Sequence, residues 1–252
     1  MGIGAPNGNY YTGQVEEAPN LDWKGSVPLA KLFEEKLGIP VALTNDANAA
    51  AMGEMTYGVA RGMKNFIMIT LGTGVGSGIV VNGQVVYGSD GFAGELGHAI
   101  IDRTPEARQC GCGRKGCLEA YCSATGIVRT AREMLIKDTR PSKLRSINPD
   151  DITGLDVSVA AKEGDELALE ILRYTGTLLG KACANFALFC SPEAFIFFGG
   201  MTKAGDLIME PIKKAYDENV LNIFKGKAQF LVSGLEGASA AVLGASAVGW
   251  EV

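Results

Sequence analysis

Three cysteines lie within eight residues, in the stretch CGCGRKGC at residues 110–117. Thiolates bind zinc when three or four ligands converge on a tetrahedron. The glycines between Cys110, Cys112 and Cys117 permit the tight turn that this arrangement requires. A fourth ligand is needed, and the one histidine of the chain, His98, precedes Cys110 by twelve residues. The spacing predicts a structural zinc site with these four ligands, since a closed four-ligand site leaves no position for catalysis.

Two other interpretations of the cysteine cluster stay open. The thiols could form a redox pair, or they could be reduced side chains that bind nothing, and Cys122 could supply the fourth ligand if His98 does not. The sequence shows no secretion signal, which makes a disulfide framework the weaker interpretation. Cys183 and Cys190 fall in an apolar helical pattern and are expected to be buried and inert.

Composition and charge exclude several classes of protein. The 252 residues carry a net charge of −5, with an estimated pI of about 5.1. No basic run is present, so the chain by itself is not expected to bind nucleic acid or an anionic membrane surface. No apolar run approaches the roughly 20 residues of a membrane span. Without a signal peptide, a cytoplasmic location is expected.

The order of apolar and turn-forming segments predicts the α/β class, because strands alternate with helices. The dipeptide Asn82-Gly83 joins two short apolar runs and predicts a hairpin. Strands are expected at residues 39–43, 65–72, 193–200 and 228–234, and helices from residue 46 and at 124–137, 156–190, 204–224 and 237–250. The glycine- and cysteine-rich residues 91–119 are expected to form an elaborated loop.

Several polar residues allow a structural interpretation beside a functional one. Asp46 precedes an alanine-rich run and could simply cap a helix. Glu95 and Glu119 could be surface carboxylates. The stretch LGTGVGSG at residues 71–78 could be a tight turn without a ligand, although glycine loops after a strand often bind phosphate.

Taken together, the motifs resemble those of one family. NDANAAAMGE, LGTGVGSGIV, GELGH, CGCGRKGCLE and FFGGM occur in the order and spacing of the ROK family of bacterial sugar kinases and repressors. The resemblance runs from about Gly2 to the C-terminus. The stretches GIGAPNGNYYTG and APNLDWKG are most similar to the glucokinase branch of the family.

The resemblance implies a two-lobed actin/hexokinase-type (ribonuclease H-like) fold with sugar and ATP in the cleft. Residues 1–58 and 238–252 would belong to the small N-terminal lobe, and residues 59–237 to the large lobe, with a zinc loop at 91–122. Asp46 would be the catalytic base and would contact the sugar together with Asn45, Glu95, His98 and Glu119. The ATP contacts would be Gly72, Thr73, Gly74, Gly199 and Gly200.

The implied activity is ATP-dependent phosphorylation of a hexose at the 6-hydroxyl, above all glucose to glucose 6-phosphate, with Mg²⁺ as cofactor. An N-acetylhexosamine, either N-acetylglucosamine or N-acetylmannosamine, is the alternative substrate. A sugar-sensing repressor fragment and a non-catalytic sugar-binding remnant are alternatives of other classes. The resemblance also implies a homodimer.

The chain departs from the family pattern at its start. Family kinases carry a D-x-G-G-T phosphate loop well before the segment that resembles GIGAP, and this sequence contains no such motif. We therefore expect a truncated product, a fragment or one part of a split gene, with an incomplete N-terminal lobe and an exposed sheet edge. Whether this chain is active alone stays open at this point.

Overall fold

The structure is a computed structural model that describes residues 1–18, 21–23, 25–235 and 237–251. Its centre is a five-stranded mixed sheet with the strand order β7-β6-β5-β8-β9. β8 and β9 run parallel to β5. On the other side of β5, β6 pairs with it antiparallel, and β7 pairs antiparallel with β6. The strands are β5 (Phe66–Leu71), β6 (Val75–Val81), β7 (Gln84–Val85), β8 (Ala194–Phe198) and β9 (Gln229–Val232).

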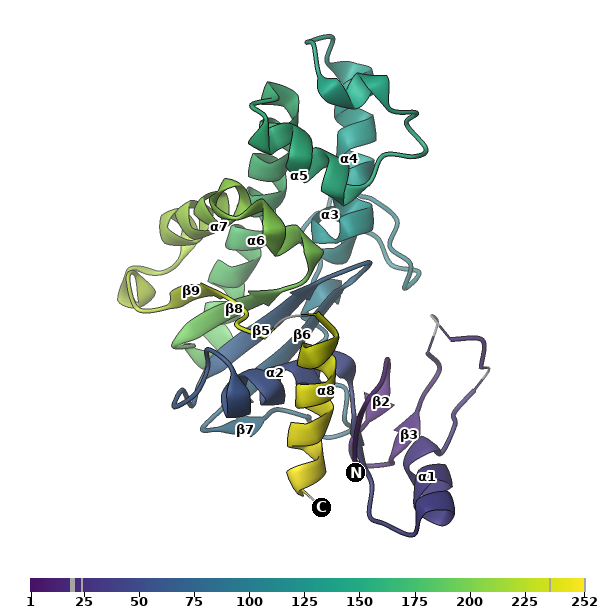
Figure 1. The fold of residues 1–252 in the computed structure, drawn as a ribbon. Coiled ribbons are helices and arrows are strands. Elements are labelled where there is room, and N and C mark those ends of the chain that lie inside the picture. Colours follow the sequence, from purple (N-terminus) through teal and green to yellow (C-terminus); the bar gives the residue numbers. More distant parts are fainter. Residues whose placement is uncertain (19–20, 24, 236, 252) are drawn as a thin grey trace.

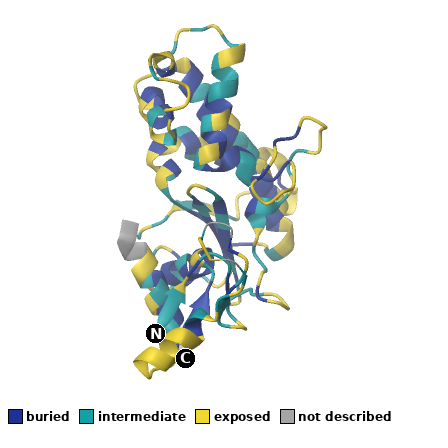
Figure 2. Ribbon diagram, turned by 90° about the vertical axis from the view of Figure 1, so that its right-hand side faces the viewer, coloured by how far each residue is buried: buried dark blue, intermediate teal, exposed yellow. Residues whose placement is uncertain are grey.

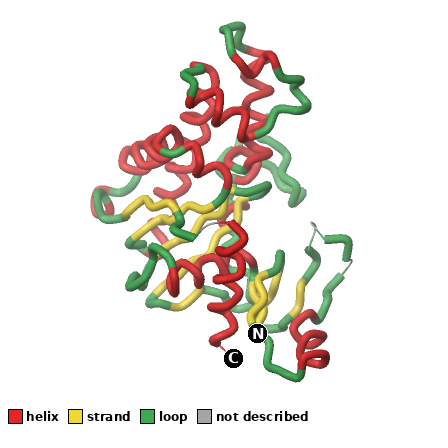
Figure 3. The backbone as a smooth tube through the Cα atoms, in the orientation of Figure 1, coloured by secondary structure: helices red, strands yellow, loops and turns green. Residues whose placement is uncertain are grey.

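Alternation along β5 decides which side chains lie on each face of this sheet. Ile67 and Ile69 face the larger core, whereas Phe66 and Met68 face a smaller one. Strands buried on both faces need a cover on each side, and helices occupy both sides of the sheet in Figures 1 and 3. The interior strands are the buried centre of the molecule in Figure 2.

The larger core lies under most of the helices. These are α3 (Glu119–Cys122), α4 (Ala124–Lys137), α5 (Gly154–Lys162), α6 (Glu166–Cys190) and α7 (Asp206–Asn219). The close approach of α6 and α7 depends on small residues, since a Cβ at Gly180 would lie 2.2 Å from Ile212 O. Pro211 is accommodated inside α7.

The other face of the sheet is covered by α2 (Asp46–Tyr57), on which α8 (Gly237–Val248) packs. Glycines make this packing possible. A Cβ at Gly76 would lie 2.6 Å from Thr70 Oγ1 and 3.1 Å from Ala47 Cβ, and one at Gly78 would lie 2.9 Å from Ala47 O. The start of α2 therefore lies directly against the first residues of β6, next to residues 72–74.

The N-terminal part of the chain lies beside α2 and α8 (Figure 1). β1 (Gly2–Gly4) pairs in parallel with β4 (Ala42–Thr44), and β2 (Gly8–Asn9) pairs antiparallel with β3 (Gln14–Val15). The helix α1 (Leu29–Leu37) follows. Pro19, Asn20 and Lys24, within the stretch APNLDWKG, lie outside the described residues.

The predicted hairpin is present, with Asn82 at φ 53° and Gly83 at φ 77° between β6 and β7. The long helix expected at residues 156–190 is instead two helices, α5 and α6. Gly164 adopts φ 81°, and the Asp165 side chain accepts a hydrogen bond from Ala168 N–H as the N-cap of α6. Asp165 also accepts one from Lys143 N–H at 2.6 Å, which fixes the break against a neighbouring loop.

Residues 91–118 form the elaborated loop that was expected. Within it, only short regular pieces occur among the described residues. These are the 3-10 helix η1 (Leu96–His98) and isolated bridges such as Ile100–Cys117. The other 3-10 helices are η2 (Lys143–Ser146), η3 (Gly200–Ala204), η4 (Asn222–Phe224) and η5 (Gly249–Glu251).

Two sequence predictions concern larger organisation. The predicted strand at 39–43 is β4, displaced toward Thr44. The division into residues 1–58 with 238–252 and residues 59–237 stays a proposal, and Val252 lies outside the described residues. No helix in the described ranges is both long and apolar enough to cross a bilayer.

Candidate active site and metal-binding cluster

A cleft of about 480 Å³ opens where the start of α2, the loop after β5, η1 and the start of α3 meet. Most of the residues predicted to bind ligands line it. They are Asn45, Asp46, Gly72, Thr73, Gly74, Glu95, His98, Glu119 and Gly199. Gly200, the first residue of η3, is not among the lining residues.

Asp46 is the first residue of α2, and it combines the two roles considered from the sequence. Asn45 is the N-cap, and its Oδ1 accepts a hydrogen bond from Ala47 N–H at 2.8 Å. Asp46 Oδ1 accepts from the same N–H at 2.8 Å, while the residue lies at the open cleft. The carboxylate is therefore oriented by the helix start and still available to a ligand.

The segment GELGH, residues 94–98, is held against β6 by a close backbone approach and by two hydrogen bonds of Ser77. Gly97 permits the contact, since a Cβ there would lie 2.0 Å from Val75 O. Ser77 Oγ donates to Gly94 O and accepts from Leu96 N–H at 3.1 Å. These contacts place Glu95 and His98 on the wall of the cleft.

Burial in the walls of the cleft shifts the pKa of two carboxyl groups. It raises the pKa of Asp46 above the ordinary 3.8, against the hydrogen bond from Ala47 N–H. Burial also raises the pKa of Glu95. The positive charge of His98 lowers this pKa, and the negative charges of Asp46 and Glu119 raise it further. Mutual repulsion of this kind means that three carboxylates converge on one space.

The glycine loop, defined as residues 72–74, follows β5 and lines the same cleft as these carboxyl groups. A Cβ at Gly72 would point into open space. Gly199 has φ 117°, and a Cβ there would lie 2.3 Å from Leu71 O. The exposed backbone at Gly72 is open to a ligand, as a loop that binds phosphate requires, whereas Gly199 is tightly packed against the end of β5.

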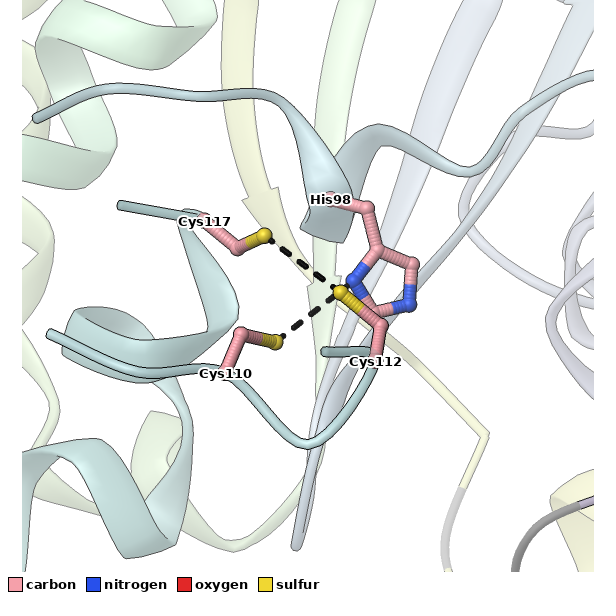
Figure 4. Close-up of side chains that lie close together, drawn as sticks. All are labelled: His98, Cys110, Cys112 and Cys117. Atoms are coloured by element: carbon pink, nitrogen blue, oxygen red, sulfur yellow. Dashed lines mark hydrogen bonds between the residues drawn. The ribbon is translucent and has the colours of Figure 1, made fainter. Parts of the chain in front are cut away.

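The predicted metal ligands form one cluster next to the cleft. The ligand atoms of His98, Cys110, Cys112 and Cys117 all lie within 4.8 Å of one another. Cys112 Sγ and Cys117 Sγ are 3.7 Å apart, and Cys110 Sγ lies 3.8 Å from His98 Nδ1. Figure 4 shows the four side chains pointing toward a common centre.

This arrangement fits a zinc ion. A tetrahedral site with Zn–S bonds of about 2.3 Å has its sulfurs about 3.8 Å apart. Burial raises the pKa of the Cys110 thiol to about 12, so the thiolate form needs a nearby cation. His98 turns Nδ1 to the sulfurs, while its Nε2 lies 3.9 Å from Glu95 Oε2 on the cleft side.

The other cysteines lie outside this cluster. Cys122 is fully buried, and its Sγ donates to Thr175 O at 3.6 Å on α6. Cys183 is also buried, and Cys190 is half-buried near the end of α6. Cys122 is therefore not brought to the cluster as an alternative fourth ligand.

Some residues at or near the site were not predicted from the sequence. Asn7 lines the cleft from the turn after β1, where it adopts φ 50°; the turn-forming dipeptide Asn7-Gly8 could have indicated it. Ala241 of α8 also lines the cleft. Arg108 is buried, pairs with Glu133 Oε2 at 2.7 Å and holds the cysteine loop against α4.

The comparisons with known proteins agree with this geometry. The model of the ROK family matches residues 2–250. The chain is 40% identical to a glucokinase of Halalkalibacterium halodurans, over the whole of this chain and 75% of that protein. The structure superposes with a TM-score of 0.83 on a ROK family glucokinase from Streptomyces griseus in complex with glucose and AMPPNP, at 35% identity, covering 97% of this chain and 80% of the other.

A regulator has a similar fold at a lower sequence identity. A ROK family transcriptional regulator, a homologue of the E. coli MLC protein, superposes with a TM-score of 0.84 at 30% identity, covering 95% of this chain and 60% of that one. The class defined by fold and site is thus that of sugar kinases and their regulatory relatives. The chain belongs to the ROK family, and the two-lobed kinase fold implied by the sequence resemblance is confirmed.

Proposed function

We propose that this chain phosphorylates a hexose at its 6-hydroxyl with ATP, and that the hexose is glucose. The observation that carries the proposal is the position of Asp46, whose carboxylate faces the same cleft as the glycine loop. The similarity to glucokinases at 35–40% identity supports glucose as the acceptor.

The residues of the cleft divide the reaction between them. A sugar hydroxyl is a weak nucleophile at neutral pH, and Asp46 accepts its proton as the oxygen attacks the γ-phosphorus. The new bond joins the sugar oxygen to that phosphorus, while the bond to the β-phosphate oxygen breaks and ADP leaves. Glu95, His98, Glu119 and Asn45 bind the remaining hydroxyl groups and orient the sugar.

Charge in the cleft indicates a need for a metal cofactor. Among the described residues that line it, there is no lysine or arginine, whereas three carboxylates are present. Mg²⁺ bound to the phosphates of ATP would supply the missing positive charge during transfer. The charge balance of the lining therefore favours Mg²⁺–ATP as the donor.

The same proposal includes a structural zinc ion on His98, Cys110, Cys112 and Cys117, supported by the distances between their ligand atoms. It would fix the loop from which Glu95, His98 and Glu119 reach the sugar. A homodimer, a cytoplasmic location and the absence of membrane and nucleic-acid partners stay predictions from the sequence.

A coupled assay on this chain tests the proposal. We expect ADP formation with glucose at about 1–100 s⁻¹, the usual range of kinases, and slower turnover with N-acetylglucosamine and N-acetylmannosamine. Faster turnover with either acetylated sugar would reassign the substrate. A folded protein that binds glucose without forming ADP would contradict the kinase proposal and favour a sugar-responsive regulator, the function that the likeness to the ROK regulator supports.

The pH profile gives a separate test of the base. A base must be ionised to accept a proton, and burial raises the pKa of Asp46 above 3.8. Activity is therefore expected to be full above this raised pKa and to fall as the pH drops through it. We expect kcat/KM to decline with acid at a pH clearly above 3.8; a profile that is flat down to about pH 4 would contradict the assignment.

A further inference from the structure

Residues 119–125, which follow Cys117, form three hydrogen bonds with the glycine loop and with Val75, the residue after it. Val75 N–H donates to Glu119 Oε2 at 3.0 Å. Ala124 N–H donates to Gly72 O at 2.9 Å, and Thr125 Oγ1 donates to Thr73 O at 3.1 Å. The loop is thus supported along its length by residues 119–125.

Glu119 and Gly74 are fitted to each other. A Cβ at Gly74 would lie only 2.4 Å from Glu119 Oε2 and 3.3 Å from its carboxyl carbon. Gly74 has no left-handed φ that would require glycine. A methyl group at position 74 would therefore displace the Glu119 carboxylate from its place beside Val75 N–H and Cys110 Sγ.

The second oxygen of Glu119 faces the metal-binding cluster. Glu119 Oε1 lies 3.5 Å from Cys110 Sγ, and Glu119 is two residues from Cys117. The same side chain lines the cleft beside Glu95 and His98. One carboxylate thus contacts the cysteine cluster, the sugar side of the cleft and the strand end that closes the glycine loop.

We propose that Glu119 is a positioning residue for the nucleotide, in addition to its role toward the sugar. It couples the sugar wall and the cysteine loop to the glycine loop, so that sugar and ATP each favour the binding of the other. Such coupling is reciprocal between the two binding affinities. The inference rests on the proposed function, because it takes the glycine loop as the phosphate site.

The first test compares two substitutions of Glu119 by their affinity for AMPPNP with Mg²⁺ in the absence of sugar. Glu119→Ala leaves Val75 N–H without its acceptor, and we expect a loss of about ten-fold. Glu119→Gln keeps an oxygen acceptor, and its affinity is expected to stay within about three-fold of the native protein. Removing a negative charge beside phosphates would by itself raise the affinity, so a loss in Glu119→Ala identifies the supporting role.

Glu95→Gln is the matched control. Glu95 lines the same cleft and contacts His98. It is expected to lose sugar affinity and to keep AMPPNP affinity within about three-fold. Calorimetric titration measures both affinities, and thermal unfolding confirms that each variant is folded.

The second test uses the fit between the two side chains and does not depend on Glu119→Ala being stable. Gly74→Ala should displace Glu119 and weaken glucose binding about ten-fold, although position 74 belongs to the glycine loop. In the Glu119→Ala background the added methyl group has room, so Gly74→Ala should change glucose affinity by less than about three-fold.

The outcomes separate this inference from the proposed function. A native chain that binds neither AMPPNP nor glucose would overturn the function itself. A native chain that binds both, with Glu119→Ala binding AMPPNP as tightly as or more tightly than native, would overturn only the positioning role of Glu119. Equal effects of Gly74→Ala on glucose affinity in both backgrounds would overturn it as well.

Discussion

Asp46→Asn is expected to abolish turnover while glucose affinity stays within a few-fold of the native protein. General-base catalysis contributes about 10²–10⁴-fold, and the amide of asparagine cannot accept a proton at neutral pH. The substitution preserves the local structure, because an asparagine Oδ1 can still accept the hydrogen bond that Ala47 N–H donates at 2.8 Å. A fall in kcat with unchanged glucose binding would therefore report chemistry and not folding.

Asp206→Asn is the matched control for this experiment. Asp206 is the first residue of α7, as Asp46 is of α2, and it is absent from the lining of the cleft. It should keep native turnover and native glucose affinity. If Asp46→Asn also kept native turnover, the general-base role would be wrong, and the carboxylate would be left with its contact at the helix start.

Local sequence patterns predicted the parts of the fold that local physics determines. The apolar runs at β5 and β8 are buried on both faces, and Asn82-Gly83 forms the hairpin because both residues tolerate positive φ. Ser123 caps α4, which was expected at 124–137, and its Oγ accepts a hydrogen bond from Gly126 N–H at 3.0 Å. Each of these features depends on residues that are neighbours in sequence.

The sequence predictions were incomplete where contacts between distant segments decide the structure. Gly164 and Asp165 divide the expected long helix, and the Lys143 N–H that donates to Asp165 comes from the start of η2, 22 residues away. Arg108 carries no sequence signal of burial, yet it is buried against α4. No periodicity marks such a residue, because its partners are set by how the loop folds back.

The candidate site shows the same division. The motifs indicated which residues belong to the cleft, including Asp46 and Glu95, but not that Gly74 and Glu119 lie against each other. That contact joins residues 45 positions apart in the chain. The motif also suggested Gly200; of these two glycines Gly199 lines the cleft, and Gly200 begins η3.

Cys112→Ser is expected to remove bound zinc and to weaken glucose binding at least about ten-fold, because sugar ligands and metal ligands share one loop. Serine does not provide the thiolate that zinc requires. Without the metal, His98 loses the contact that orients its ring, and the loop segment bearing Cys117 no longer fixes Glu119. Elemental analysis would measure zinc per chain, and calorimetry would measure glucose affinity.

Cys190→Ser separates loss of the metal from loss of a cysteine. Cys112 is exposed, so its replacement removes little packing, whereas Cys190 is half-buried on α6 and outside the cluster. The control should therefore retain about one zinc per chain and native glucose affinity, even though it perturbs the core more. Cys112→Ser could instead lose its zinc and still bind glucose with native affinity. The metal would then stabilise the loop without shaping the sugar site. Glu95, His98 and Glu119 would be held by other contacts, such as those of Gly97 and Ser77.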